Sequence, residues 1–144
     1  MKRSILFLIL SSITLYAAIA ITPTQEIQTN GTVKDMVLRD DMLLMGTDNG
    51  VLQVYDYKNK VFTKNITLEK VKDFVGDEVP ARVFSIDKIE GSYLLLSDSG
   101  KGGYANLWMH ENNVTTKLVS ATDKKAAIKA RFIDKEHILL GFFE

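Results

Sequence analysis

The sequence predicts an all-β protein built from repeated four-stranded antiparallel sheets. Short apolar runs alternate with turns rich in Asp, Asn and Gly along most of the chain, which is the pattern of strands joined by hairpins. The same order of runs and turns returns once and begins a third time. The chain has 144 residues, of which 46% are hydrophobic, and no cysteine, so its stability must come from the core alone.

The first predicted sheet covers residues 32–67 and is organised around a hairpin at 41–61. In this hairpin the turn Asp48-Asn49-Gly50 separates two apolar runs, which is a strong hairpin signal. A polar segment at 21–31 precedes the sheet, and we expect it to be an exposed lead-in. Strands are expected at 33–37, 42–45, 51–57 and 61–67.

The second predicted sheet covers residues 82–119, and a third, incomplete one covers 127–144. The second differs from the first mainly in a longer, glycine-rich connection at 97–103. In the third, a turn at 134–136 separates two strands. Strands are expected at 83–86, 93–96, 104–109 and 114–119, then at 128–133 and from residue 138 onward.

Three similar apolar runs indicate that these units are repeats. LLMG at 43–46, LLLS at 94–97 and ILLG at 138–141 lie 51 and 44 residues apart. Tyr55 matches Trp108 once the longer glycine-rich connection is allowed for, and both are expected in the core. A period of about 40 to 50 residues with four strands is typical of propeller blades.

The sequence therefore predicts about two and a half blades of a WD40-like β-propeller. A β-sandwich is the alternative, since it also gives short strands at regular intervals. A closed propeller needs roughly four to eight blades. We therefore expect the chain to be the N-terminal fragment of a longer propeller protein.

The first 20 residues have the features of a secretory signal peptide. Two basic residues precede an apolar run at 5–15, and the small residues at 18–20 form an A-x-A cleavage site. A membrane anchor is the alternative, but the run is short and no basic cluster follows it. Cleavage after Ala20 predicts a soluble periplasmic protein without a membrane anchor.

Charge and composition argue against several function classes. With 18 basic and 18 acidic residues, the zero net charge opposes nucleic-acid binding. His110 and His137 are expected in exposed turns, so no metal, haem or other cofactor is predicted. The connection at 97–103 lacks the order of a phosphate-binding loop, and the adjacent carboxylates at 40–41 and 77–78 are expected to be turn residues. We therefore expect no catalytic residues and a protein that is not an enzyme.

The connection at 68–80 is long for a link between two sheets. Val71, Phe74 and Val75 have a spacing that fits one helical turn. Long loops held by a rigid sheet are a common place for binding sites. The alternative is that Phe74 fills a gap between two sheets.

Blade geometry places four connections on one face of the protein. These are the turn at 48–49 and the connections at 68–80, 97–104 and 120–126. We predict that protein partners bind on this face. The candidate binding residues are Asp48, Asn49, Lys72, Phe74, Asp77, Lys101 and Tyr104.

The chain contains the stretches VKDMVLRDDMLLMGTDNGVLQVYD, KDFVGDEVPARVFSIDKI, LLLSDSGKGGYANLWMHENN and IKARFIDKEHILLGFF. Together these resemble the NapL family of the periplasmic nitrate reductase system of epsilonproteobacteria. The resemblance covers residues 21–144 and implies an exported, WD40-like protein longer than this chain. It implies an accessory or interaction protein with nitrate reductase components as partners, and it supplies no catalytic residues. The dipeptide Tyr55-Asp56 is the nearest match to the Trp-Asp of WD repeats.

Two further functions remain open for an exported propeller. One is an enzyme, a hydrolase or lyase, whose active site lies over the central channel and uses blades absent here. The other is a scaffold for outer-membrane assembly. Neighbouring genes for nitrate reduction, or for a carbohydrate or lactone pathway, would separate the accessory protein from the enzyme.

Overall fold

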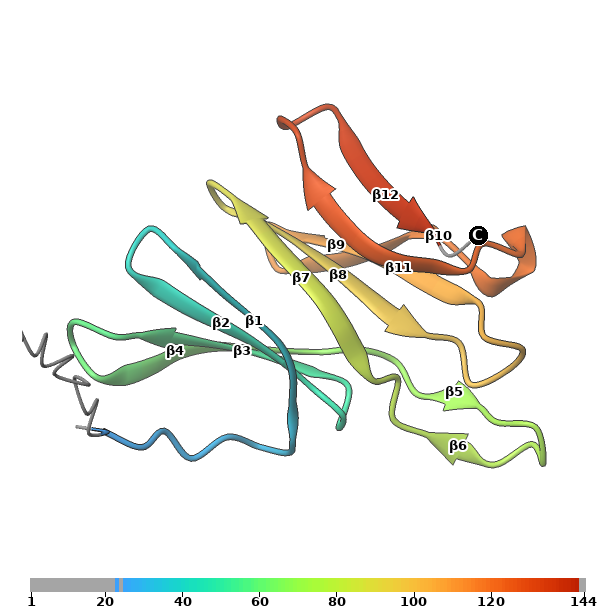
Figure 1. Cartoon of the computed structure of the whole chain (residues 1–144), viewed down its shortest axis with the longest axis horizontal. Helices are drawn as coiled ribbons and strands as arrows, with labels where there is room; N and C mark the ends of the chain where they lie inside the picture. The colour runs from blue at the N-terminus through green and yellow to red at the C-terminus, as the bar shows by residue number, and fades with distance from the viewer. Residues whose placement is uncertain (1–22, 24, 143–144) are drawn as a thin grey trace, which may run out of the picture.

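The computed structural model describes residue 23 and residues 25–142. The predicted signal peptide and its cleavage site therefore lie outside the described residues. Within these described residues the fold is all-β, as predicted: apart from one 3-10 turn, η1 (Ala121–Asp123), every element there is a strand (Figure 1). Nowhere in the described part of the chain is there a helix with the length and hydrophobicity needed to cross a membrane.

Two four-stranded antiparallel sheets and two smaller ones make up the fold (Figure 1). The first sheet contains β1 (Val33–Arg39), β2 (Met42–Thr47), β3 (Val51–Asp56) and β4 (Val61–Thr67) in chain order. The second contains β7 (Val83–Ile89), β8 (Ser92–Asp98), β9 (Ala105–Glu111) and β10 (Val114–Val119). The third has two strands, β11 (Ala127–Phe132) and β12 (Ile138–Phe142).

The connection at 68–80 forms a short hairpin of β5 (Val71–Lys72) and β6 (Glu78–Val79). The predicted helical turn is therefore wrong. The physical reason is the Asp73 carboxylate, whose Oδ1 accepts hydrogen bonds from the backbone N–H groups of Val75, Gly76 and Asp77 at 2.9 Å each. A side chain that binds the following backbone N–H groups stabilises a tight turn at the expense of a helix.

The three main sheets pack face to face. Successive side chains along a strand of the second sheet point alternately toward the first sheet and toward the third. Leu95 and Trp108 belong to a buried cluster shared with Leu44 and Val54 of the first sheet. Their neighbours on the opposite face, including Leu94, pack in a second cluster with residues of the third sheet. Strands β8 and β9 of the second sheet are therefore buried on both faces, whereas its outer strand β10 is exposed.

The register of the sheets corrects the predicted repeat by one residue. Val33 pairs with Thr47 across a β-bulge, and Val83 pairs with Ser97 across an equivalent bulge, so equivalent residues lie 50 positions apart rather than 51. Leu44, not Leu43, therefore corresponds to Leu94. Three consecutive apolar residues give no local signal of which one faces which sheet, so the sequence left this shift undetermined.

The same register shows that Tyr55 does not correspond to Trp108. Tyr55 pairs with Leu43, and the residue 50 positions after Leu43, Tyr93, pairs with His110. The expected burial is nevertheless confirmed, because Tyr55 is 5% exposed and Trp108 is 3% exposed. Both aromatic residues are part of the core.

His110 is buried in β9, so its predicted position in an exposed turn is wrong. Its Nδ1 lies 2.8 Å from Thr115 Oγ1, whereas its Nε2 has no hydrogen-bond partner. Burial, and secondly the charge of Lys64, lower the pKa of His110 below its ordinary value. His137 is exposed, as predicted, and contacts Asp134.

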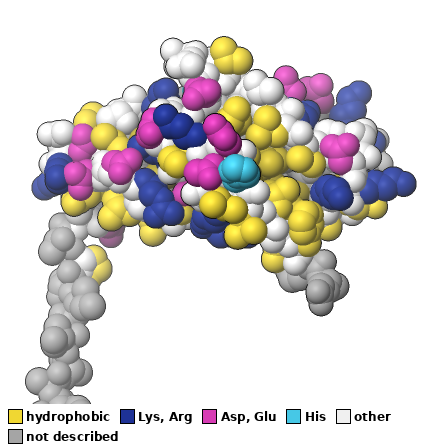
Figure 2. All heavy atoms as spheres, turned by 90° about the horizontal axis from the view of Figure 1, so that it is seen from above, with side chains coloured by type: hydrophobic (Ala, Val, Ile, Leu, Met, Phe, Trp, Pro, Cys, Tyr) yellow, Lys and Arg dark blue, Asp and Glu magenta, His cyan; other side chains and the backbone are white. Residues whose placement is uncertain are grey.

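Exposed ion pairs connect neighbouring hairpins at the end of the molecule that carries the β1–β2, β7–β8 and β11–β12 turns. Lys88 Nζ lies 2.6 Å from Asp40 Oδ2, and Lys135 Nζ lies 2.5 Å from Glu90 Oε2. The face seen from this end shows basic and acidic side chains beside one another (Figure 2). The adjacent carboxylates of Asp40 and Asp41 stand in a turn, as expected.

Candidate functional site

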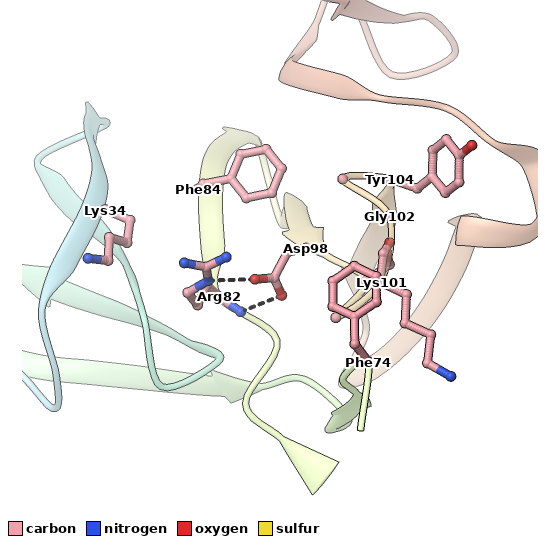
Figure 3. A pocket seen from close by; sticks show the side chains of 11 residues that line it. Lys34, Phe74, Arg82, Phe84, Asp98, Lys101, Gly102 and Tyr104 are labelled. Atoms are coloured by element: carbon pink, nitrogen blue, oxygen red, sulfur yellow. Dashed lines mark hydrogen bonds and ion pairs between the residues drawn. The ribbon is translucent and has the colours of Figure 1, made fainter. Parts of the chain in front are cut away.

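The opposite end, which we term the loop end, carries the connections at 47–51, 68–82, 98–105 and 119–127. An open hollow of about 500 Å³ lies here. Three aromatic side chains line it, Phe74 from the β5–β6 hairpin, Phe84 from β7 and Tyr104 from the residue before β9 (Figure 3). We term it the aromatic hollow. Its volume is in the range of about 300–1,000 Å³ found for ligand sites.

A paired arginine and aspartate are among the residues that line the aromatic hollow (Figure 3). Arg82 Nε lies 2.5 Å from Asp98 Oδ2, and the Arg82 backbone N–H donates to Asp98 Oδ1 at 3.1 Å. The Asp98 backbone N–H donates in return to the Arg82 carbonyl oxygen at 3.1 Å. These bonds tie the end of β8 to the start of β7.

Asp48 makes the equivalent contact in the first sheet, 50 positions earlier. The Thr32 backbone N–H donates to Asp48 Oδ1 at 2.8 Å, and the Asp48 N–H donates to the Thr32 carbonyl oxygen at 3.0 Å. The bond from the Thr32 backbone is the main cause that lowers the pKa of Asp48. Asp48 therefore closes the end of its own sheet.

A second hollow of about 310 Å³ adjoins the first. Four lysines line it, so we term it the lysine hollow: Lys70, Lys72, Lys101 and Lys117. The Lys117 ammonium lies 4.3 Å from the centre of the Trp108 ring and 3.9 Å from Glu69 Oε2. Within the described residues, the other three lysines form no ion pair.

The segment Ser99-Gly100-Lys101 is the wall between the two hollows, because Ser99 and Lys101 line both. Gly100 has a φ of +74°, and a Cβ built on it would lie 2.5 Å from the carbonyl oxygen of Lys72. Only glycine permits this approach of the wall to β5. The connection then leads into β9, so a strand follows it, as predicted.

Four of the seven predicted binding residues line these hollows, namely Lys72, Phe74, Lys101 and Tyr104. The other three do not. Asn49 Nδ2 donates to the Asn30 carbonyl oxygen of the lead-in at 3.2 Å, and Asp48 holds Thr32. Asp77 belongs to the turn formed by Asp73.

Several lining residues were absent from the sequence prediction. Lys34 and Phe84 come from β1 and β7, and the sequence indicated only strands at these positions. These two residues lie 50 positions apart and occupy equivalent places in β1 and β7. Once the register is corrected, this equivalence can be recognised in the sequence. Arg82, Asp98, Lys70 and Lys117 were also missed.

Phe74 does not fill a gap between sheets. It is 80% exposed, and the adjacent Val75 is 86% exposed. Both stand at the tip of the β5–β6 hairpin, and Phe74 lines the aromatic hollow (Figure 3). The exposure of these two large apolar side chains opposes the interpretation of Phe74 as a structural plug.

Comparisons of the chain with protein-family models, with curated proteins and with solved structures gave no match. Among the described residues, no three side chains of His, Cys, Asp or Glu gather in a way that could hold a metal ion. The site is therefore described by its own geometry, which combines aromatic surface with ammonium groups. Such a surface can hold an apolar group next to an anion.

Proposed function

We propose that this chain belongs to an exported β-propeller protein that binds a protein partner through its loop end and catalyses no reaction. The stacking of the three sheets supports the propeller, because their first strands β1, β7 and β11 lie beside one another (Figure 1). In a propeller the first strand of each blade lies nearest the central axis. The features of residues 1–20 support export.

The observation that carries the binding role is the exposed Phe74–Val75 tip. Exposed apolar side chains rimmed by charged residues mark interaction surfaces. Here the tip stands next to a hollow that has room for a side chain of another protein. Phe74 is an anchor of the kind that dominates binding energy in protein interfaces.

We further propose that the partner belongs to the periplasmic nitrate reductase system. This part rests on the resemblance to the NapL family alone. Co-purification from cells grown with nitrate tests it. Recovery of reductase components with the tagged protein supports the association, and their absence from a complex that contains other proteins refutes it.

The binding role is tested by a double substitution, Phe74→Ser with Lys101→Gln. We expect co-purification of the partner to fall at least tenfold while the melting temperature stays within about 2 °C, because both side chains are largely solvent-exposed. The matched control is Tyr57→Ser with Lys60→Gln, at the β3–β4 turn away from the loop end. An equal loss in both double variants, or a loss of stability without selective loss of binding, refutes the proposal.

A further inference from the structure

Charge is unevenly distributed over the chain. The whole sequence has 18 basic and 18 acidic residues, yet the two hollows at the loop end are lined by six basic side chains and only one acidic side chain, Asp98. Asp98 is paired with Arg82, Asp48 lies 3.9 Å from Lys34, and Glu69 lies 3.9 Å from Lys117. Lys70, Lys72 and Lys101 remain uncompensated within the described residues.

These three ammonium groups create a local positive potential that attracts anions. A lysine binds a carboxylate as a point charge and imposes little geometry on it, so several carboxylates along a flexible chain can be accommodated. Zero net charge and a pI of about 6.7 are unlike a nucleic-acid-binding protein, which has a basic surface overall. The charge favours an acidic protein segment.

The aromatic hollow indicates that the ligand also carries an apolar group. It meets the lysine hollow at the wall of Ser99-Gly100-Lys101, and the Lys101 side chain runs away from the Arg82–Asp98 pair (Figure 3). An extended peptide rises about 3.3 Å per residue, so a segment of roughly six residues extends for about 20 Å. Such a segment can engage both hollows at once.

We propose that the loop end binds an extended acidic peptide segment of its partner, which places one aromatic or large aliphatic side chain in the aromatic hollow and carboxylates in the lysine hollow. This inference rests on the proposed function and specifies its partner chemistry. Apolar contact gives the anchor, and the lysines select acidic sequences and raise the association rate.

Synthetic peptides test whether the loop end prefers acidic sequences. The full-length protein is purified from the cells that produce it. The probe is a fluorescein-labelled heptapeptide with one central phenylalanine and three glutamates on each side. Fluorescence anisotropy should show binding that weakens at least tenfold when the glutamates become glutamines, and again when the phenylalanine becomes alanine. Raising the ionic strength from about 0.05 to 0.5 M should weaken binding of the acidic peptide only, because salt screens the ammonium groups.

Two charge reversals in the lysine hollow are compared with a third at a distant position. Lys72→Glu and Lys101→Glu should each weaken binding of the acidic peptide at least fivefold. Lys60→Glu, in the β3–β4 turn, makes the same charge change away from the loop end and should leave it unchanged. Circular dichroism confirms that all three variants are folded.

Equal affinity for the acidic and neutral peptides, or equal effects of all three reversals, overturns the acidic-peptide inference. Binding of dextran sulfate or of anionic vesicles, with the same lysine dependence and with no peptide binding, also overturns it in favour of a general polyanion site. If the peptides fail but the Phe74–Lys101 double variant still loses its partner, the proposed function stands and only the partner chemistry is wrong. Failure of both refutes the proposed function as well.

Discussion

The carboxylate of Asp35 in β1 accepts a hydrogen bond from the backbone N–H of Ile86 in β7, at 2.9 Å. The second sheet repeats this contact toward the third, since Ser85 Oγ accepts from the Ala130 N–H at 3.0 Å. Asp35 and Ser85 both follow the β-bulge in their strands. One position in the repeat therefore links each sheet to the next through the backbone.

The Asp35 contact is expected to stabilise the stack of sheets. Asp35→Ala leaves the Ile86 N–H without its partner and also frees Lys129, whose Nζ lies 3.0 Å from the carboxylate. We expect a loss of about 1–3 kcal/mol in the free energy of unfolding, measured by urea denaturation. Asp35→Asn, which keeps an acceptor oxygen, should lose less. Unchanged stability of Asp35→Ala would show that the contact contributes nothing.

Trp108 is expected to be a large contributor to the core between the first two sheets. It is 3% exposed, and its indole Nε1 donates to Ser97 Oγ at 3.0 Å. Trp108→Ala should cost about 3–5 kcal/mol, and Trp108→Phe less, because the phenyl ring fills part of the site.

Trp108 also reports on its own position, since it is the only tryptophan in the sequence. Its fluorescence emission in the native protein should be blue-shifted and should move to longer wavelength on unfolding in urea. Native emission typical of a water-exposed indole would contradict its place in the core.

Strand positions could be predicted because alternation and turn residues are local signals. The turn at Asp48-Asn49-Gly50 and the polar turns after it separate the strands almost where the structure has them. The register could not be predicted. Leu94, Leu95 and Leu96 are alike in sequence, and which of them faces which sheet depends on the bulge beside Ser85.

The site was predicted in part for a similar reason. Phe74 and Lys101 lie in connections whose length and composition attract attention. Lys34 and Phe84 lie in strands, and their exposure at the loop end depends on how neighbouring sheets pack, which is a non-local property. The spacing of the apolar residues in the β5–β6 hairpin predicted a helical turn. This prediction was wrong because the Asp73 side chain binds the following backbone N–H groups and forms a tight turn instead.

His110 should make stability depend on pH. Burial and the Lys64 charge lower its pKa below 6.5, so the folded protein resists its protonation. Well above pH 6.5 both states are neutral at this residue, and the full stability is present. As the pH falls below 6.5, the unfolded chain takes up a proton that the folded chain binds less readily, and the free energy of unfolding falls. This loss ends below the folded pKa.

Urea denaturation between about pH 5.5 and 7 measures this effect, where the slope for one histidine cannot exceed about 1.4 kcal/mol per pH unit. His110→Phe should flatten the pH dependence, although it also loses the Nδ1 contact with Thr115 Oγ1 and so lowers stability at every pH. His137→Asn, at an exposed position, should retain it. A dependence that survives in His110→Phe would refute the assignment.

Gly100 should be more sensitive to substitution than Gly103, which lies in the same connection between β8 and β9. Gly100 and Gly103 have similar φ values of +74° and +70°, so alanine is strained at both. Only at Gly100 would a Cβ meet a neighbour, the Lys72 carbonyl oxygen, whereas nothing lies within 4 Å at Gly103. Gly100→Ala should therefore cost about 1–3 kcal/mol more than Gly103→Ala in urea denaturation. Equal costs would show that the wall does not pack against β5.

The binding role of the loop end is tested most directly by photo-crosslinking in the cells that make the protein. A benzoylphenylalanine placed at Phe74 samples the exposed hairpin tip, and one placed at Tyr57, which is 44% exposed, samples the β3–β4 turn. We predict a discrete crosslink to a second protein from position 74 and none from position 57. No crosslink from position 74, or the same products from both positions, would contradict the account.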